Sequence, residues 1–497
     1  MVPSPQDILS RYFGFKAFRS PQDQVVERLL GSPAGEGHSL VIMPTGGGKS
    51  LCYQVPALGL EGGTLVISPL IALMRDQVDA LRKRNIPAHF INSTVSARDR
   101  AARLDRFARG ELKMLYVTPE RFRKREFVDV IREAGVALLA VDEAHCISEW
   151  GHDFRPDYSR VGEFRALIGN PPVIALTATA TPPVQKDIIS ALGLTPDSVK
   201  TFHRGIQRPN LRLEARDVFS DDEKLEHILE VRKRFPGPGI VYFALIKGLE
   251  RFSDYLDRKG VEHGVYHGKL NAKERDRAQR GFMESDDGLI LATNAFGMGI
   301  DKANIRFVVH AEMPGSLESY YQEIGRAGRD GDAALCRLLY DQNDLAVQME
   351  FLKWSNPEPR FYKRLYDVLR REPEKVNSMG GDYLREQLNY RNRHDFRMET
   401  ALNMLERHGA LSGSLAAGDL RLKNPENETA DGSEDIPSDP PANLIDDDLH
   451  EAKLLNGREK LAALVQYFRS ESCRRVHISD YFGFPGEPPC GNCDCCS

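Results

Sequence analysis

The stretch Ser39-Leu-Val-Ile-Met-Pro-Thr-Gly-Gly-Gly-Lys-Ser50 joins a short apolar run to a glycine-rich turn that ends in Lys-Ser. Glycines let backbone N–H groups turn toward a polyphosphate, and the start of a following helix adds a favourable dipole. Lys49 would reach the β- and γ-phosphates of a nucleotide, and the Ser50 hydroxyl would ligate Mg²⁺. Met43 replaces the first glycine of the usual phosphate-loop pattern, so a simple glycine-rich turn remains the alternative. The residues expected to bind phosphate and metal are Thr45, Gly46, Gly47, Gly48, Lys49 and Ser50.

Short apolar runs alternate with helical stretches on both sides of this turn. The pattern extends from Ser39 to about Ala180, resumes after Arg204 and ends near Tyr340. Apolar strands that alternate with helices predict parallel sheets covered on both faces. We therefore expect two α/β domains in tandem, over residues 1–204 and 205–345.

Two adjacent acids follow a second apolar run, in Val141-Asp-Glu-Ala-His145. Downstream of a phosphate loop, Asp142 would hold the shell of a Mg²⁺ ion and Glu143 would polarise the water that attacks the γ-phosphate. The alternative is an acidic helix start, where carboxylates favour the helix dipole.

The net charge of −5 is unpromising for a protein that binds nucleic acid. However, residues 424–452 hold ten acidic side chains and no Lys or Arg, so the rest of the chain carries a positive balance. No apolar run approaches the roughly 20 residues that a membrane span requires. The N-terminus does not resemble a signal peptide, so a cytoplasmic or nucleoid location and no membrane partner are expected.

The composition changes after the second α/β region. Residues 346–424 show helical apolar spacing followed by a possible hairpin, which suggests a small winged-helix-like domain. Residues 425–450 are acidic and proline-rich and predict a disordered linker. A helical segment and a cysteine cluster fill residues 451–497.

Five of the eight cysteines lie within the last 25 residues of the sequence. Four thiolates at the observed spacing can surround one tetrahedral Zn²⁺, which would be structural and not catalytic. Two disulfides are the competing interpretation, and Cys495 is a spare thiol that could substitute for Cys496. The expected zinc ligands are Cys473, Cys490, Cys493 and Cys496.

Together these segments resemble the RecQ branch of the superfamily-2 helicases. The resemblance covers residues 8–350 and 453–496, in order along the chain. It rests on Phe13–Gln22 (motif 0), Met43–Gln54 (the phosphate loop), Ser68–Gln77 (Ia), Thr118–Arg121 (Ib), Asp142–His145 (II), Ser148–Asp157 (an aromatic-rich loop), Thr177–Ala180 (III), Ala292–Asp301 (V), Tyr321–Gly331 (VI) and the cysteine module.

The resemblance implies roles for further residues. Phe15 would stack on adenine, with Arg19 and Gln22 hydrogen-bonding the base edge or the nearby nucleotide. Arg329 would act as an arginine finger, with Arg326 as a supporting phosphate contact. The residues implied to contact DNA are Trp150, His152, Phe154 and Arg155.

The resemblance also implies two RecA-like domains that hydrolyse ATP and unwind DNA with 3′-to-5′ polarity. Single-stranded and tailed or branched duplex DNA would be the partners. Here about a hundred residues separate the motor from the zinc cysteines, so the strand-separating hairpin of the family is not carried over. A DNA-dependent ATPase that cannot unwind, a non-catalytic nucleic-acid-binding module and an RNA helicase remain alternatives.

Overall fold

A computed structural model describes residues 4–33, 35–44, 46–69, 71–148, 156–203, 208–297, 300, 302–388, 395–424 and 436–496. Thr45 and the four predicted DNA-contacting residues, Trp150, His152, Phe154 and Arg155, lie outside the described residues. The chain divides into two compact units. The first comprises Met1–Asp341 with Ala463–Ser497, and the second comprises Gln342–Ala462.

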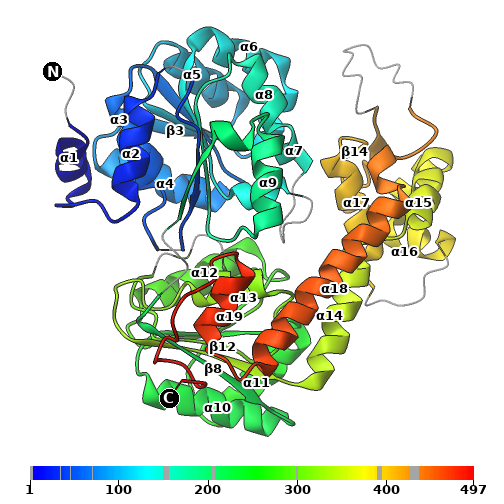
Figure 1. Ribbon diagram of the computed structural model, residues 1–497. Helices are drawn as coiled ribbons and strands as arrows, with labels where there is room; N and C mark the ends of the chain where they lie inside the picture. Colours follow the sequence, from blue (N-terminus) through cyan, green and yellow to red (C-terminus); the bar gives the residue numbers. More distant parts are fainter. Residues whose placement is uncertain are drawn as a thin grey trace. The chain divides into compact units, whose positions relative to one another are not determined.

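The first lobe of the first unit is built on a seven-stranded sheet of order β3-β4-β2-β5-β6-β1-β7, in which every pair is parallel. Helices cover both of its faces (Figure 1). The strands are β1 (Ser39–Ile42), β2 (Gly63–Ile67), β3 (Ala88–Ile91), β4 (Met114–Val117), β5 (Val136–Val141), β6 (Val173–Thr177) and β7 (Lys200–His203).

Two apolar clusters, one on each face, bury the strand side chains of this lobe. The helices are α1 (Pro5–Ile8), η1 (Leu9–Phe13), α2 (Gln22–Gly31), α3 (Leu51–Gly59), α4 (Ile71–Lys83), α5 (Ala97–Ala108), η2 (Pro119–Arg123), α6 (Arg125–Ala134), η3 (Ala144–Ile147), α7 (Pro156–Ser159), α8 (Val161–Leu167), α9 (Pro182–Ala191) and η4 (Pro196–Ser198).

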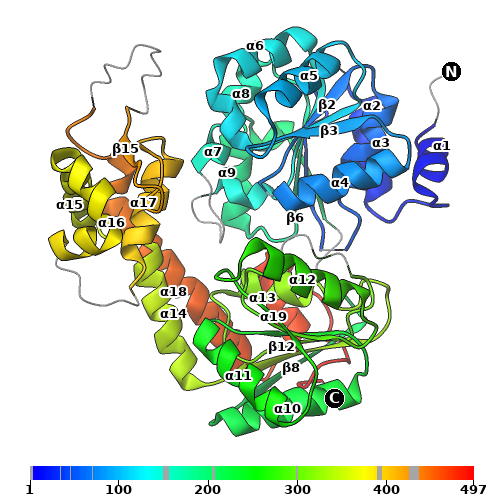
Figure 2. The ribbon, with the colours of Figure 1, turned by 180° about the vertical axis from the view of Figure 1, so that it is seen from behind.

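The second lobe contains a six-stranded parallel sheet of order β10-β11-β9-β12-β13-β8. Figure 2 shows this lobe from behind, with α10, α11 and α12 around the sheet. Its strands are β8 (Leu211–Asp217), β9 (Gly239–Tyr242), β10 (Gly264–Tyr266), β11 (Leu289–Ala292), β12 (Phe307–His310) and β13 (Ala334–Tyr340). Its helices are α10 (Asp221–Arg234), α11 (Ile246–Arg258), α12 (Ala272–Glu284) and α13 (Leu317–Ile324). The prediction of two parallel α/β domains is confirmed.

The second unit is mainly helical and has its own apolar core. Its elements are α14 (Gln342–Ser355), α15 (Pro359–Arg371), α16 (Pro373–Gln387), α17 (Arg397–Arg407), the antiparallel pair β14 (Leu411–Ser412) and β15 (Arg421–Leu422), η5 (Ala442–Leu444) and the first part of α18 (Asp447–Arg469). The predicted helices and hairpin are present, while the winged-helix assignment stays a prediction.

The predicted disordered linker, residues 425–450, does not extend to residue 450. Residues 425–435 lie outside the described part, but Leu444 is buried in the core of the second unit. The next helix begins at Asp447, four residues earlier than expected, because Asp447 and Asp448 occupy its first turn, where carboxylates favour the dipole. Among the described helices, none has the length and apolar character needed to cross a membrane.

Candidate active site

The glycine-rich turn lies between β1 and α3, as expected of a phosphate-binding loop. Gly46 and Gly48 have φ of +79° and +81°, values that favour glycine. Lys49 Nζ donates to the carbonyl of Met43 at 3.2 Å, which folds the lysine back over the loop. Met43 is fully buried in the lobe core, so its side chain replaces the usual glycine without blocking the turn.

The side chain of Gln22 holds this loop in place through hydrogen bonds to its backbone. Its side chain is buried, and its Nε2 donates to the carbonyls of Gly47 (3.3 Å) and Gly48 (3.0 Å). Its Oε1 accepts from the backbone N–H of Arg19 at 2.8 Å. The side chain of Phe15 is 48% exposed. Motif 0 is therefore joined to the phosphate loop by Gln22, a role that the sequence did not indicate.

The acidic pair follows β5 directly. Asp142 is buried, and this burial together with the charge of Glu143 raises the pKa of Asp142 to about 7, although Lys49 acts in the opposite direction. Glu143 has a left-handed backbone (φ 48°, ψ 47°) and immediately precedes η3. A buried carboxylate beside a phosphate loop fits a bound divalent cation, because the cation would supply the compensating charge.

His145 connects the acidic pair to the end of β6. Its Nδ1 lies 3.0 Å from Thr177 Oγ1 and 3.4 Å from the carboxylate of Glu143. Thr177 Oγ1 also accepts from the backbone N–H of Thr179 at 3.1 Å. No pattern in the sequence predicts this connection between motifs II and III. The only signal in the sequence was that both segments follow apolar strands, which end at the same edge of a parallel sheet.

The two arginines of motif VI follow α13 in the second lobe. Arg326 is buried and donates to the carbonyl of Gly297, while Arg329 Nη1 donates to the carbonyl of Ile300 at 2.8 Å. Both arginines therefore hold the backbone of motif V. Arg329 also lies beside the phosphate loop, since a Cβ added at Gly46 would come within 3.1 Å of its Cγ.

The four predicted zinc ligands come together. The sulfur atoms of Cys473, Cys490, Cys493 and Cys496 all lie within 4.8 Å of one another, as a tetrahedral ion would require. Cys473 precedes α19 (Arg474–Tyr481). Burial raises its pKa, but hydrogen bonds from backbone amides, including those of Val476 and Cys490, outweigh this effect and lower the pKa to about 6. Burial and the neighbouring thiols raise the pKa of Cys490 to about 12, so the geometry of the cluster, and not these pKa values, supports a metal site.

The sulfur of Cys495 is not part of this four-sulfur cluster. Its Sγ lies 3.7 Å from the carbonyl of Ser470 and 3.6 Å from Asp494 Oδ1. Cys495 does form a second group of possible ligands with Cys493 and Asp494. The carboxylate of Asp494, however, is already bound to Arg474 and to the backbone N–H of Ala215. Of the two groups, the four-cysteine cluster is therefore the better suited to hold a metal ion.

The segment from Cys473 to Cys496, here called the cysteine module, is joined to the outer edge of the second sheet. Leu213 in β8 pairs in parallel with Cys493, and the backbone N–H of Asp494 donates to the carbonyl of Leu213 at 3.1 Å. The Asp494 carboxylate accepts from the N–H of Ala215 at 2.8 Å. The module thus covers an edge strand that would otherwise expose unpaired backbone groups.

Family models match three parts of the chain. The DEAD/DEAH box helicase model matches residues 19–188, the helicase conserved C-terminal domain model matches residues 222–331, and the RecQ zinc-binding model matches residues 442–497. These matches cover both lobes and the cysteine module, in the order that the sequence predicts.

Among solved structures, the chain resembles Mss116p bound to single-stranded RNA and AMP-PNP. The TM-score is 0.57 at 14% identity, over 81% of this chain and 89% of that one. It also resembles the helicase Lhr of Mycobacterium smegmatis bound to single-stranded DNA and AMP-PNP, with a TM-score of 0.53 at 17% identity, over 85% and 61% of the two chains. At these identities the likeness shows the fold alone.

Curated relatives are more similar in sequence. The ATP-dependent DNA helicase RecQ of Bacillus subtilis is 44% identical over 72% of this chain, which spans 60% of that relative. RecQ of Haemophilus influenzae is 34% identical over 99% of this chain, which spans 64% of it. The probable ATP-dependent DNA helicase RecS of B. subtilis is 37% identical over 73% of this chain and 72% of its own length. On this evidence the chain belongs to the RecQ family of helicases.

Proposed function

We propose that this protein is an ATP-dependent DNA helicase that hydrolyses ATP between its two RecA-like lobes and unwinds DNA. The observation that carries the proposal is the position of Arg329 from the second lobe beside Gly46 of the phosphate loop. Its relatives named as ATP-dependent DNA helicases support the same activity. Because the chain spans less than two thirds of two of these relatives, the activity of the whole protein is a proposal.

Each residue of the site would have a separate role in the proposed reaction. The amides of the phosphate loop and Lys49 would bind the phosphates, and Ser50 with Asp142 would hold Mg²⁺, which screens phosphate charge when bound. Glu143 would orient the attacking water and accept its proton. Arg329 would stabilise the charge that develops on the γ-phosphate.

Phe15 is exposed and available to stack on the base. Gln22 already donates to the phosphate loop, so we propose that it positions the loop and that Arg19 contacts the nucleotide. Arg326 is buried against Gly297, which supports a role in fixing motif V more than direct contact with phosphate.

We further propose that DNA is the polynucleotide and that the four-cysteine cluster binds Zn²⁺. The DNA contacts proposed for Trp150, His152, Phe154 and Arg155 and the 3′-to-5′ polarity rest on the resemblance to the family. Aromatic faces and a guanidinium suit unpaired bases and their backbone.

The proposal is tested by ATPase and strand-separation assays on the full chain. Single-stranded DNA should stimulate ATP turnover, and a 3′-tailed duplex should be unwound while a 5′-tailed one is not. Lys49→Ala should abolish both activities. Lys113→Ala is the matched control, because Lys113 also donates its Nζ to a backbone carbonyl in this lobe, that of Leu60 at 3.0 Å.

Three outcomes would contradict the proposal in different ways. Equal ATP turnover with and without DNA would remove the coupling to a polynucleotide. Stimulated turnover without strand separation would indicate a translocase. Stronger stimulation by single-stranded RNA than by DNA would indicate an RNA helicase.

A further inference from the structure

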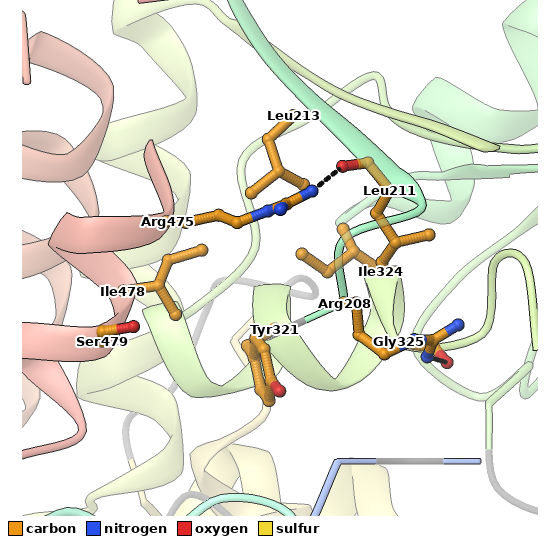
Figure 3. A pocket seen from close by; sticks show the side chains of 9 residues that line it. All are labelled: Arg208, Leu211, Leu213, Tyr321, Ile324, Gly325, Arg475, Ile478 and Ser479. Atoms are coloured by element: carbon orange, nitrogen blue, oxygen red, sulfur yellow. Dashed lines mark hydrogen bonds between the residues drawn. The ribbon is translucent and has the colours of Figure 1, made fainter. Parts of the chain in front are cut away.

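Residues 208–211 lie between two functional parts of the second lobe and have no assigned role. On one side is the turn formed by residues 325–329, which carries Arg326 and Arg329. On the other side is the cysteine module. Figure 3 shows Arg208 directed toward Gly325, and Arg475 of α19 directed toward the carbonyl of Leu211.

Arg208 fixes the 325–329 turn through its backbone. Its guanidinium donates to the carbonyls of Gly325 (3.2 Å), Ala327 (2.8 Å) and Gly328 (2.8 Å). These three carbonyls come from the residues that flank Arg326 and precede Arg329. The planar guanidinium of Arg208 therefore fixes the backbone from which the side chains of Arg326 and Arg329 project.

Asn210 closes the same turn from the next position. Its Nδ2 donates to the carbonyls of Gly328 and Asp332, both at 2.8 Å. Gly328 has φ of +54°, and a Cβ there would lie 2.5 Å from Asn210 Nδ2. The backbone packs against Asn210 so closely that only glycine fits, and the residue after this glycine is Arg329.

The cysteine module holds residues 208–211 from the opposite side. Arg475 donates to the carbonyls of Pro209 (3.1 Å) and Leu211. Asn492, which lies between two of the clustered cysteines, donates to the same carbonyls at 3.1 and 3.4 Å. The apolar space behind these contacts is lined by Leu211, Tyr321, Ile324 and Ile478.

We propose that Arg208 and Asn210 are positioning residues for Arg329. Arg475 and Asn492 of the cysteine module hold the backbone on either side of Asn210 in place. This inference rests on the proposed ATPase activity. Neither Arg208 nor Asn210 needs to touch the nucleotide. They fix the turn from which the Arg329 side chain extends toward the phosphate loop, and a displacement of about 1 Å in such a catalytic group can cost roughly a hundredfold in rate.

The first test compares Arg208→Ala and Asn210→Ala with wild type in the DNA-stimulated ATPase assay. We expect kcat to fall roughly 10- to 100-fold for Arg208→Ala, and less for Asn210→Ala. The KM for ATP and the Kd for single-stranded DNA should stay within about twofold, because ground-state binding does not depend on Arg329. Arg208→Lys covers the case in which the alanine variant does not fold, and it should show a partial loss of kcat.

Arg165→Ala is the matched control. Arg165 is a buried arginine that also holds a turn through backbone carbonyls, those of Asn170 and Pro171. That turn precedes β6, at the amino ends of the strands and away from the phosphate loop. If Arg165→Ala lowers kcat as much as Arg208→Ala at equal loss of stability, the effect is general and the inference is wrong.

The second test is a double-mutant cycle with Arg329→Ala. If Arg208 acts through Arg329, the double variant should have the same kcat as Arg329→Ala alone, within about twofold. Multiplicative losses would show that Arg208 acts elsewhere and would overturn the inference. If the wild-type protein hydrolyses no ATP, the proposed function is wrong. If the wild type is active and Arg208→Ala has the same kcat, only this inference is wrong.

The role of the cysteine module is tested by Arg475→Ala. We expect kcat to fall in the same direction as for Arg208→Ala but by less, roughly threefold to tenfold, because Asn492 still holds both carbonyls. The zinc content measured by atomic absorption should stay at the wild-type value. An unchanged kcat would show that the cysteine module does not help to position Arg329. A loss of zinc would show that Arg475 acts by keeping the module folded.

Discussion

In the first lobe, the phosphate loop and the Asp142–Glu143 pair each follow a buried strand directly. In the second lobe, Arg326 and Arg329 follow the helix α13 and are held by residues from distant parts of the chain. The two lobes share a parallel α/β fold, so the fold does not cause this difference. A loop that follows a strand is positioned by the sheet itself, whereas a turn after a helix needs other contacts to fix it.

The sheet edges differ in the same way. In the first lobe, Arg82 and Arg103 donate to the outward carbonyls of Ala88 and Phe90 in the edge strand β3. In the second lobe, the outer edge of β8 is covered by the cysteine module. In the first lobe neighbouring side chains therefore cover the β3 edge, whereas the β8 edge of the second lobe is covered by a module about 280 residues further along the chain.

The largest expected effect concerns Arg329. Arg329→Ala should lower the DNA-stimulated kcat by roughly 10³-fold, because an arginine finger stabilises charge that forms only in the transition state. The Kd for ATP should change by less than about threefold, since the first lobe holds the phosphates. Rapid-mixing ATPase and equilibrium nucleotide titration measure the two quantities. Loss of ATP binding in this variant would break the proposed division between the lobes.

The second prediction concerns the cysteines. Cys473→Ser should remove the bound zinc and destabilise the second lobe by roughly 3 kcal/mol, because the cover over β8 is lost. Zinc analysis and calorimetry measure these effects, and the affinity for ATP should persist in the first lobe. Cys495→Ser is the matched control and should retain zinc. If Cys495→Ser also lost zinc, the assignment of the four ligands would be incorrect.

The third prediction concerns Glu143. Glu143→Gln keeps the size of the side chain but removes the proton acceptor, so kcat should fall by roughly 10²-fold at unchanged affinity for ATP. Single-turnover kinetics measure the hydrolysis step. Glu133→Gln, at an exposed position within α6, provides the control. A kcat equal to that of wild type would show that Glu143 is not the proton acceptor. The role of the first lobe would then be limited to binding ATP.

The smallest effect concerns a buried ion cluster in the second lobe. Burial raises the pKa of Glu214, but hydrogen bonds from Arg212 and Arg337 outweigh it and lower the pKa to about 2. A carboxyl with a lowered pKa stabilises the folded lobe above its unfolded pKa of about 4.5, and this stability is lost as the pH falls toward 2.

Glu214→Gln should therefore cost about 2 kcal/mol at neutral pH and progressively less below pH ~4.5. Denaturant melts at several pH values give the difference in unfolding free energy. A difference that stayed constant down to the lowest pH would mean that the charge of Glu214 does not contribute.

The sequence itself determined the strand-following parts of this protein. Val41 and Ile42 before the glycines, Ala140 and Val141 before Asp142, and the cysteine spacing are local patterns whose chemistry depends on neighbours along the chain. The phosphate loop, the acidic pair and the four-cysteine cluster were predicted for that reason. The sequence pattern predicts too late a start for the helix that begins at Asp447, because the acidic and proline-rich composition conceals the buried Leu444.

Only the tertiary structure decided how the remaining residues act. No local pattern indicates that Gln22 braces Gly48, that His145 meets Thr177, or that Arg208 holds Gly328. Each of these contacts joins a side chain to a partner 26 to 120 residues away. Whether such a bond forms depends on which strands become neighbours in the sheet, and that choice is made by the packing of the whole lobe.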